Sequence, residues 1–122
     1  MPNVCVIEIK VTDIVKGRKF YTEVLDFEVT SEKYLPDVLV LGHEGPDLIL
    51  HIAEEPIEIT YPQSAQSLLF FQVADIHAAD KKLKDNGVEI IEGPAESPPG
   101  PYLVFRDPFG NVHGLMEIKD SG

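Results

Sequence analysis

The stretch Val11-Thr12-Asp13-Ile14 recurs later in the chain as Val73-Ala74-Asp75-Ile76, and this repeat decides the expected fold. The two copies begin 73 − 11 = 62 residues apart, which is about half of the 122-residue chain. In each copy an apolar, strand-like stretch precedes an Asp that stands where a helix N-cap is expected. The chain therefore consists of two similar halves, each with a strand that leads into a helix.

The predicted elements follow the same order in both halves. The first half has strand candidates at Val4–Val11, Phe27–Thr30, Val38–Leu41 and Leu48–Ala53, with a helix that begins after Asp13. The second half has strand candidates at Ser67–Val73, Val88–Ile91, Tyr102–Arg106 and Asn111–Ile118, with a helix between Asp75 and Gly87. Each half is thus a βαβββ unit. The polar, Pro-containing stretch Glu54–Gln66 is the expected linker, and Gly93–Pro101 is expected to be a loop.

Alternation along the first strand separates two faces. Ile7, Ile9 and Val11 share a uniformly apolar face, which we expect to pack against the helix. Val6, Glu8 and Lys10 share the other face. Its mixture of apolar and charged side chains favours the wall of a cavity over a plain core.

Together, these motifs resemble those of the vicinal oxygen chelate superfamily, which includes glyoxalases, bleomycin-resistance proteins and extradiol dioxygenases. The matching segments are Val11–Ile14, Phe20–Phe27, Val73–Ile76, Asn86–Val88 and Arg106–Asn111. The resemblance covers essentially the whole chain and implies a single α+β domain over residues 1–122. Its two βαβββ modules, at about 1–55 and 66–120, would form curved mixed sheets around a cup-shaped cavity. Chemistry depends on the site and does not follow from the fold.

The resemblance also implies where metal-dependent relatives place the ligands of a divalent metal. These ligands lie on the first and fourth strands of each module, and the motif spacing puts Val6, Leu68 and Gly114 at three of the four positions. The remaining position aligns best with His51 or its neighbour Leu50. A divalent ion needs three or four N, O or S ligands, and the first three residues offer none. We therefore expect no metal and no other cofactor, with a divalent metal as the alternative.

Glu8 and His51 are the candidate catalytic residues. Glu8 is in phase with Val6 and is predicted to point into the cavity, where burial raises the pKa of an unpaired carboxyl. Such a group is a candidate general base, or an anchor for a cationic ligand. The alternative for Glu8 is an ion pair with Lys10 or an exposed strand end. His51 can relay protons beside a carboxylate, or it can be an ordinary hydrogen-bonded histidine.

Ligand contacts are expected from residues predicted to line the cavity: Val6, Leu68, Phe70, Gly114, Met116 and Arg106. Gly114, inside a strand, either opens space for a bound molecule or marks a bulge or a close helix contact. Arg106 either orients an anionic group or pairs with an acidic neighbour. By alternation His113 faces away from Gly114. Gln72, Tyr34, Tyr102 and Phe105 are either further pocket residues or core residues.

The charge balance excludes several classes of partner. Ten Lys and Arg against 21 Asp and Glu give a net charge of −11, and the basic residues are scattered. Nucleic-acid binding and docking on an anionic membrane are therefore not expected. No apolar run approaches the ~20 residues of a spanning helix, and the N-terminus lacks a signal-peptide pattern. With a single Cys5, a cytoplasmic location is expected. The acidity either attracts cationic ligands or serves solubility alone.

These observations lead to two main hypotheses of function. In the first, the chain binds a small organic molecule, antibiotic- or metabolite-like, without a metal, as the bleomycin-resistance branch implies. In the second, it is a lyase, isomerase or dioxygenase of the glyoxalase type, with Glu8 and His51 in acid–base or metal roles. A purely structural or regulatory module is a third alternative, so whether the chain is an enzyme stays open. The resemblance also implies a homodimer.

Overall fold

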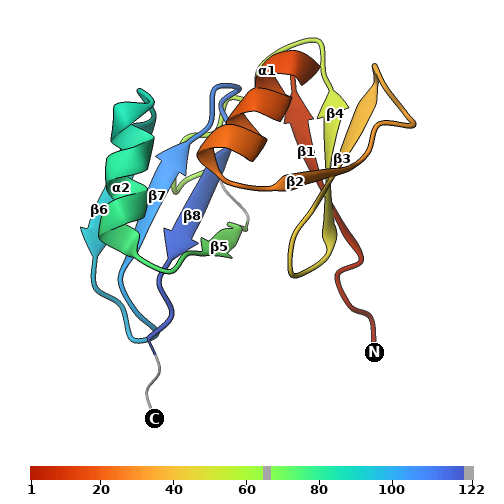
Figure 1. The fold of residues 1–122 in the computed structure, drawn as a ribbon. Coiled ribbons are helices and arrows are strands. Elements are labelled where there is room, and N and C mark those ends of the chain that lie inside the picture. Colours follow the sequence, from red (N-terminus) through yellow and green to blue (C-terminus); the bar gives the residue numbers. More distant parts are fainter. Residues whose placement is uncertain (65–66, 120–122) are drawn as a thin grey trace. The chain divides into compact units, whose positions relative to one another are not determined.

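The computed structural model describes residues 1–64 and 67–119. The chain divides into two compact units, residues 1–57 and 58–122, and each has a four-stranded mixed sheet with one helical segment (Figure 1). The α+β class is thus confirmed. Residues 58–64 of the expected linker belong to the second unit, while residues 65–66 and Asp120 lie outside the described residues. Within the described ranges, no helix combines the length and apolar character needed to cross a membrane.

Unit 1 has the sheet order β1-β4-β3-β2, with β1 parallel to β4 and the other neighbours antiparallel. Its strands are β1 (Val6–Val11), β2 (Glu28–Ser31), β3 (Val38–Gly42) and β4 (Asp47–Ile52). Helix α1 (Ile14–Lys19) continues into the π-helical turn η1 (Phe20–Val24). The Asp13 carboxylate accepts a hydrogen bond from the Lys16 backbone N–H at 3.0 Å, which confirms the predicted N-cap.

The helix of unit 1 packs on the face of the sheet that was predicted to be apolar. The buried residues of this face are Ile9, Val11, Leu39, Leu41, Leu48 and Leu50. A Cβ on Gly17 of α1 would lie 3.2 Å from Leu50 Cδ1 and 3.4 Å from Val11 Cγ1. Gly17 costs about 1 kcal/mol of helix propensity relative to Ala, and it allows α1 to approach the sheet closely.

Unit 2 repeats this topology, with the sheet order β5-β8-β7-β6 and β5 parallel to β8. Its elements are β5 (Phe70–Gln72), α2 (Ile76–Asp85), β6 (Glu89–Ala95), β7 (Tyr102–Arg106) and β8 (Val112–Met116). Asp75 caps α2 by accepting from the backbone N–H groups of His77 and Ala78. Gly87 follows the helix with φ 72°, as its position predicted. The sequence repeat therefore corresponds to a structural one.

Two predicted boundaries in unit 2 are wrong by three residues or more. Strand β5 begins at Phe70, so Leu68 precedes the strand. Strand β6 runs through Gly93 and Pro94 to Ala95, where a loop was expected. The proline is tolerated because β6 is an edge strand and its register shifts on both sides of Glu92, so the ladder needs no donor from residue 94.

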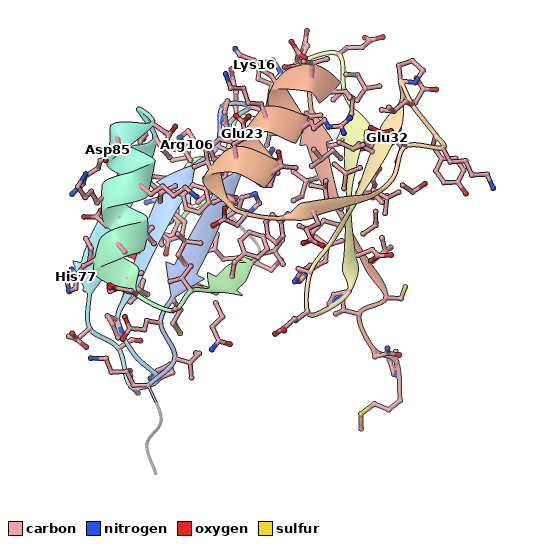
Figure 2. All side chains as sticks on the ribbon, in the orientation of Figure 1. Lys16, Glu23, Glu32, His77, Asp85 and Arg106 are labelled. Atoms are coloured by element: carbon pink, nitrogen blue, oxygen red, sulfur yellow. The ribbon has the colours of Figure 1, made fainter. Side chains whose placement is uncertain are left out.

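The core of unit 2 lies between α2 and one face of its sheet. Its largest buried side chains are Ile76, Leu83, Leu103, Phe105 and Leu115. His113 is buried on this face, with its ring 5.4 Å from that of Phe71 and 5.8 Å from that of Phe105. His113 thus faces away from Gly114, as predicted, and Phe105 is a core residue. Figure 2 shows His77 and Asp85 on the outer side of α2.

A buried carboxylate organises the turn between β7 and β8. Asp107, which is 4% exposed, accepts hydrogen bonds from the backbone N–H groups of Phe109 (2.9 Å) and Asn111 (2.8 Å). It also accepts from Asn111 Nδ2 at 2.8 Å. The Gly110 N–H donates to the Asp107 carbonyl at 3.2 Å, which closes the turn.

Candidate functional site

The pairing register shows which residues of the two units correspond. Glu8 pairs with Ile49 in unit 1, and Phe70 pairs with Gly114 in unit 2. One step along each ladder, Lys10 pairs with His51 and Gln72 pairs with Met116. These side chains lie on the face opposite the helix, which we call the open face of each unit. The open face carries Glu8, Lys10, Val38, Val40, Ile49 and His51 in unit 1, and Phe70, Gln72, Tyr102, Val104, Gly114 and Met116 in unit 2.

The same register locates the fourth position at which the resemblance expects a metal ligand. Ile49 occupies the place in unit 1 that Gly114 occupies in unit 2. Leu50 is fully buried under α1, and His51 lies two residues further along the strand. The four positions are thus Val6, Ile49, Leu68 and Gly114, none of which has a side-chain N, O or S atom. These residues do not fit a divalent metal. Over residues 1–64 and 67–119, no group of three His, Cys, Asp or Glu side chains is arranged to hold one.

Glu8 and His51, the predicted catalytic pair, lie together on the open face of unit 1. Glu8 Oε1 contacts His51 Nδ1 directly, and Lys10 Nζ lies 3.1 Å from each of these two atoms. A ring nitrogen carries either a hydrogen or a lone pair, so Nδ1 cannot donate to Glu8 and accept from Lys10 in one tautomer. When Nδ1–H donates to Glu8, Lys10 donates to the same carboxylate. His51 Nε2 is then the atom of the ring that can accept a proton.

The electrostatics of this cluster give Glu8 and His51 different roles. The pKa of Glu8 is lowered, first by the hydrogen bond with His51 and second by that with Lys10. Its side chain is 41% exposed, so burial does not dominate. Glu8 is therefore a carboxylate at neutral pH that orients His51, and a base at this place would be the imidazole. The ion pair of Glu8 with Lys10, which was the alternative interpretation, is present as well.

The open face of unit 2 is apolar and aromatic at the corresponding positions. A Cβ on Gly114 would lie 2.3 Å from Phe70 Cδ1, so the Phe70 ring fills the space that the missing side chain leaves. This ring is 41% exposed and meets Tyr102 edge-on, with the centroids 6.1 Å apart. Met116 is half-buried and pairs with Tyr102 in the sheet. The structure thus brings together the predicted ligand-contacting residues Phe70, Gly114 and Met116.

The other predicted ligand-contacting residues occupy different surroundings. Arg106 Nη1 donates to the Ile59 carbonyl at 2.8 Å, and Arg106 Nε lies 3.6 Å from Glu89 Oε2 (Figure 2 labels Arg106). This arginine fastens residues 58–64 to β7, which favours a structural role. Val6 is 46% exposed at the start of β1, and Leu68 is half-buried before β5.

The sequence patterns did not single out Tyr61 and Glu92, which lie near this face. The side chains of Tyr61 and Tyr102 both lie beside Glu92. Partial burial, together with the negative charge of Glu92, raises the pKa of each tyrosine, so both hydroxyls stay protonated beside the carboxylate. Tyr61 lies in the expected linker and Glu92 directly before the expected loop, where no periodic pattern marks a face. Nothing in the sequence could have singled them out.

Comparison with protein families decides the identity of this fold. The family model of the Glyoxalase/Bleomycin resistance protein/Dioxygenase superfamily matches residues 4–114. The chain belongs to this superfamily. Its assignment agrees with the βαβββ repeat and with the sheet order in each unit.

Several known proteins are similar to this chain in sequence or structure. YetH of Bacillus subtilis, an uncharacterised protein, is 28% identical over 114 residues, which cover 91% of this chain and 94% of YetH. The crystal structure of TnmS3, an antibiotic binding protein from Streptomyces sp. CB03234, is 27% identical, with 98% of each chain covered and a TM-score of 0.70. FosX, a fosfomycin resistance protein from Listeria monocytogenes, has a TM-score of 0.79 over 98% of this chain and 93% of FosX. At 18% identity, FosX shows a common fold alone.

Proposed function

We propose that this glyoxalase/bleomycin-resistance superfamily member binds a small organic molecule, antibiotic- or metabolite-like, without a bound metal. The observation that carries the proposal is the chemistry of the open faces. The positions of metal ligands hold Val6, Ile49, Leu68 and Gly114, while Phe70 presents an exposed aromatic ring beside Gly114. The likeness to TnmS3 over nearly the whole chain supports an antibiotic-like ligand.

Removal of apolar surface from water favours ligand binding at the open face of unit 2. Small-molecule sites are mostly apolar and aromatic, with a few polar groups that fix the orientation of the ligand. Phe70, Tyr102 and Met116 supply the apolar part on unit 2, and an aromatic side chain contributes a large contact area. The net charge of −11 increases the encounter rate with cationic ligands.

Binding is tested by thermal unfolding of the full chain, treated with EDTA, against basic glycopeptide antibiotics and a panel of metabolites. A ligand at 100 times its Kd stabilises the folded chain by about 2.7 kcal/mol, which raises the Tm measurably. Phe70→Ala should abolish the rise, and Val15→Ala, at a position 79% exposed on α1, is the matched control. The proposal fails if no compound raises the Tm, or if binding requires added divalent metal.

The proposal includes a homodimer, which the resemblance implies, in the cytoplasm. Size-exclusion chromatography with light scattering should give twice the chain mass of 13.5 kDa. A monomer at every concentration would contradict this part and leave ligand binding to be judged by the thermal shifts.

An enzyme of the glyoxalase type, without metal, is the second candidate, and the Glu8–His51 contact is the observation that favours it. In this account His51 Nε2 takes a proton from a carbon acid while Glu8 stabilises the imidazolium. General acid–base catalysis contributes about 10²–10⁴-fold, so His51→Gln should lower the isomerisation of methylglyoxal–glutathione adducts by about that factor. His77→Gln, at an exposed position at the start of α2, is the control. Equal rates in both variants would remove this candidate.

A further inference from the structure

We propose that Phe70, Tyr102, Tyr61 and Glu92 form a binding site for the alkylammonium group of a small organic cation, either a protonated or a quaternary amine. This inference rests on the proposed function, because it names the chemical class of the ligand and its place on unit 2. All four residues belong to the compact unit formed by residues 58–122.

The register of the sheet places three of these residues on one face. Across the strands, Phe70 pairs with Gly114, Gly114 with Val104, and Val104 with Glu92. Phe70 and Glu92 are thus the two ends of one cross-strand row. Tyr102 lies two residues before Val104 on β7, and its ring contacts that of Phe70 at 6.1 Å. The glycine at position 114 leaves the space that the Phe70 ring fills within this row.

Tyr61 reaches the same face because residues 58–64 are fastened to the sheet. Arg106, which shares the face of β7 with Tyr102, donates to the Ile59 carbonyl at 2.8 Å. A short turn follows, in which the Thr60 N–H donates to Ser64 Oγ at 2.7 Å and the Ser64 N–H donates to the Thr60 carbonyl at 2.8 Å. Tyr61 lies within this turn, and its side chain lies beside Glu92.

Glu92 is held in place and still has acceptor capacity for a ligand. Two tyrosine side chains lie beside it, and a carboxylate offers about four lone-pair sites. The raised pKa of Tyr61 and Tyr102 keeps both phenols as donors over the physiological pH range. Because the Glu92 side chain is exposed, a ligand can approach it directly.

The chemistry of the cluster selects an organic cation over other ligands. Aromatic faces carry negative potential and attract ammonium groups within about 6 Å of a ring centroid. Tyr61 and Tyr102 lie beside the carboxylate, and the Phe70 ring contacts that of Tyr102, so the cluster combines this attraction with a formal charge. An anion would meet the charge of Glu92 and the net charge of −11. A small, strongly hydrated inorganic cation would gain little from the rings, whereas methyl groups on nitrogen contact them well.

The test compares choline with 3,3-dimethylbutan-1-ol, its uncharged carbon analogue of the same shape, by NMR titration of the full chain. Choline should bind at least about tenfold more tightly, and it should shift the ring signals of Tyr61 and Tyr102 in a saturable way. The chain has four tyrosines, and the exposed Tyr34 of unit 1 provides an internal control whose signals should not move.

The deciding variant is Glu92→Gln, which removes the charge and keeps the shape and the capacity to accept from both tyrosines. It should weaken choline binding about tenfold, the usual size of a lost charge-assisted contact. Glu96→Gln makes the same change in net charge at an exposed position after β6 and should change binding less than twofold. Phe70→Leu, as a second variant, should weaken choline more than the neutral alcohol.

Each outcome bears on the inference. Equal binding of choline and the alcohol, or equal effects of Glu92→Gln and Glu96→Gln, would overturn it. Failure of choline to bind would overturn it too. If neutral compounds still raise the Tm in the thermal panel, the proposed function survives the loss of this inference, whereas a panel without any hit overturns both.

Discussion

The open faces of the two units have the same topology and opposite chemistry. At corresponding places in the parallel strand pairs, unit 1 has Glu8 across from Ile49, and unit 2 has Phe70 across from Gly114. One step further, Lys10 and His51 correspond to Gln72 and Met116. The repeat is thus retained where the sheets pack on their helices, while the open faces of the two units are free to diverge.

The faces that pack on the helices are alike, with one exception. By the register, Leu39 corresponds to Leu103 and Leu50 to Leu115, and all four are buried. His113, however, stands where unit 1 has Leu48. The turns that precede these strands also differ, because unit 2 has the buried Asp107 and unit 1 has an exposed turn that includes Glu44. These two differences can be tested by substitution.

The largest effect is expected at the turn of unit 2. Asp107→Ala leaves the N–H groups of Phe109 and Asn111 without their buried acceptor. Hydrogen bonds to charged groups are worth about 1.5–3 kcal/mol each, so we expect a loss of about 3 kcal/mol or more in the free energy of unfolding in urea. Glu44→Ala, in the corresponding turn of unit 1, should cost less than about 0.5 kcal/mol. Similar losses in the free energy of unfolding for the two variants would show that the two turns contribute equally to stability.

Next in size is the pH dependence that His113 adds to unit 2. Burial lowers the pKa of His113 to about 4, against the opposing charge of Asp107. Above pH 6.5 both the folded and the unfolded chain carry a neutral ring. Between pH 6.5 and 4 the unfolded chain takes up a proton and the folded chain does not, so stability is lost as the pH falls. The difference of 6.5 − 4 = 2.5 corresponds to roughly 3 kcal/mol.

His113→Leu, which copies unit 1, should remove this loss. Urea unfolding at pH 7, 5.5 and 4 measures the loss of stability. Between pH 7 and pH 4 the free energy of unfolding of the wild-type chain should fall by roughly 3 kcal/mol more than that of the variant. The carboxyl groups titrate in both proteins, so their contribution cancels when the two free energies of unfolding are subtracted. Parallel curves for the two proteins would mean that His113 has the same pKa in the folded and the unfolded chain.

The smallest effect concerns the charged cluster of unit 1. Because the hydrogen bond with His51 is the main cause of the lowered pKa of Glu8, His51→Ala should move the carboxyl titration of Glu8, followed by ¹³C NMR, up toward 4.5. Lys10→Ala should move it less. The stability that Glu8 contributes is present above pH 4.5 and is lost as the pH falls through its folded pKa. Solvent screening keeps this contribution below about 1 kcal/mol. A larger rise of the Glu8 pKa in Lys10→Ala than in His51→Ala would show that Lys10, and not His51, lowers this pKa most.

Much of the fold could be predicted because it depends on local patterns. The repeat around Asp13 and Asp75, the helix caps and the buried face of β1 all follow from short-range spacing. Within the site, the meeting of Glu8 and His51 could be anticipated from alternation along two strands. The alignment of Ile49 with Gly114 could not, because the turns before β4 and β8 differ in sequence and the register is set by pairing across the sheet. The expected cavity, homodimer and ligand remain predictions.

The fastening of Ile59 by Arg106 determines where the second half of the chain starts as a folded body. A fragment cut at Ser67, as the sequence repeat alone would suggest, omits the tyrosine that completes the Glu92 cluster and the carbonyl that Arg106 holds. A gene fragment or a graft of this module onto another scaffold should therefore begin at Glu58.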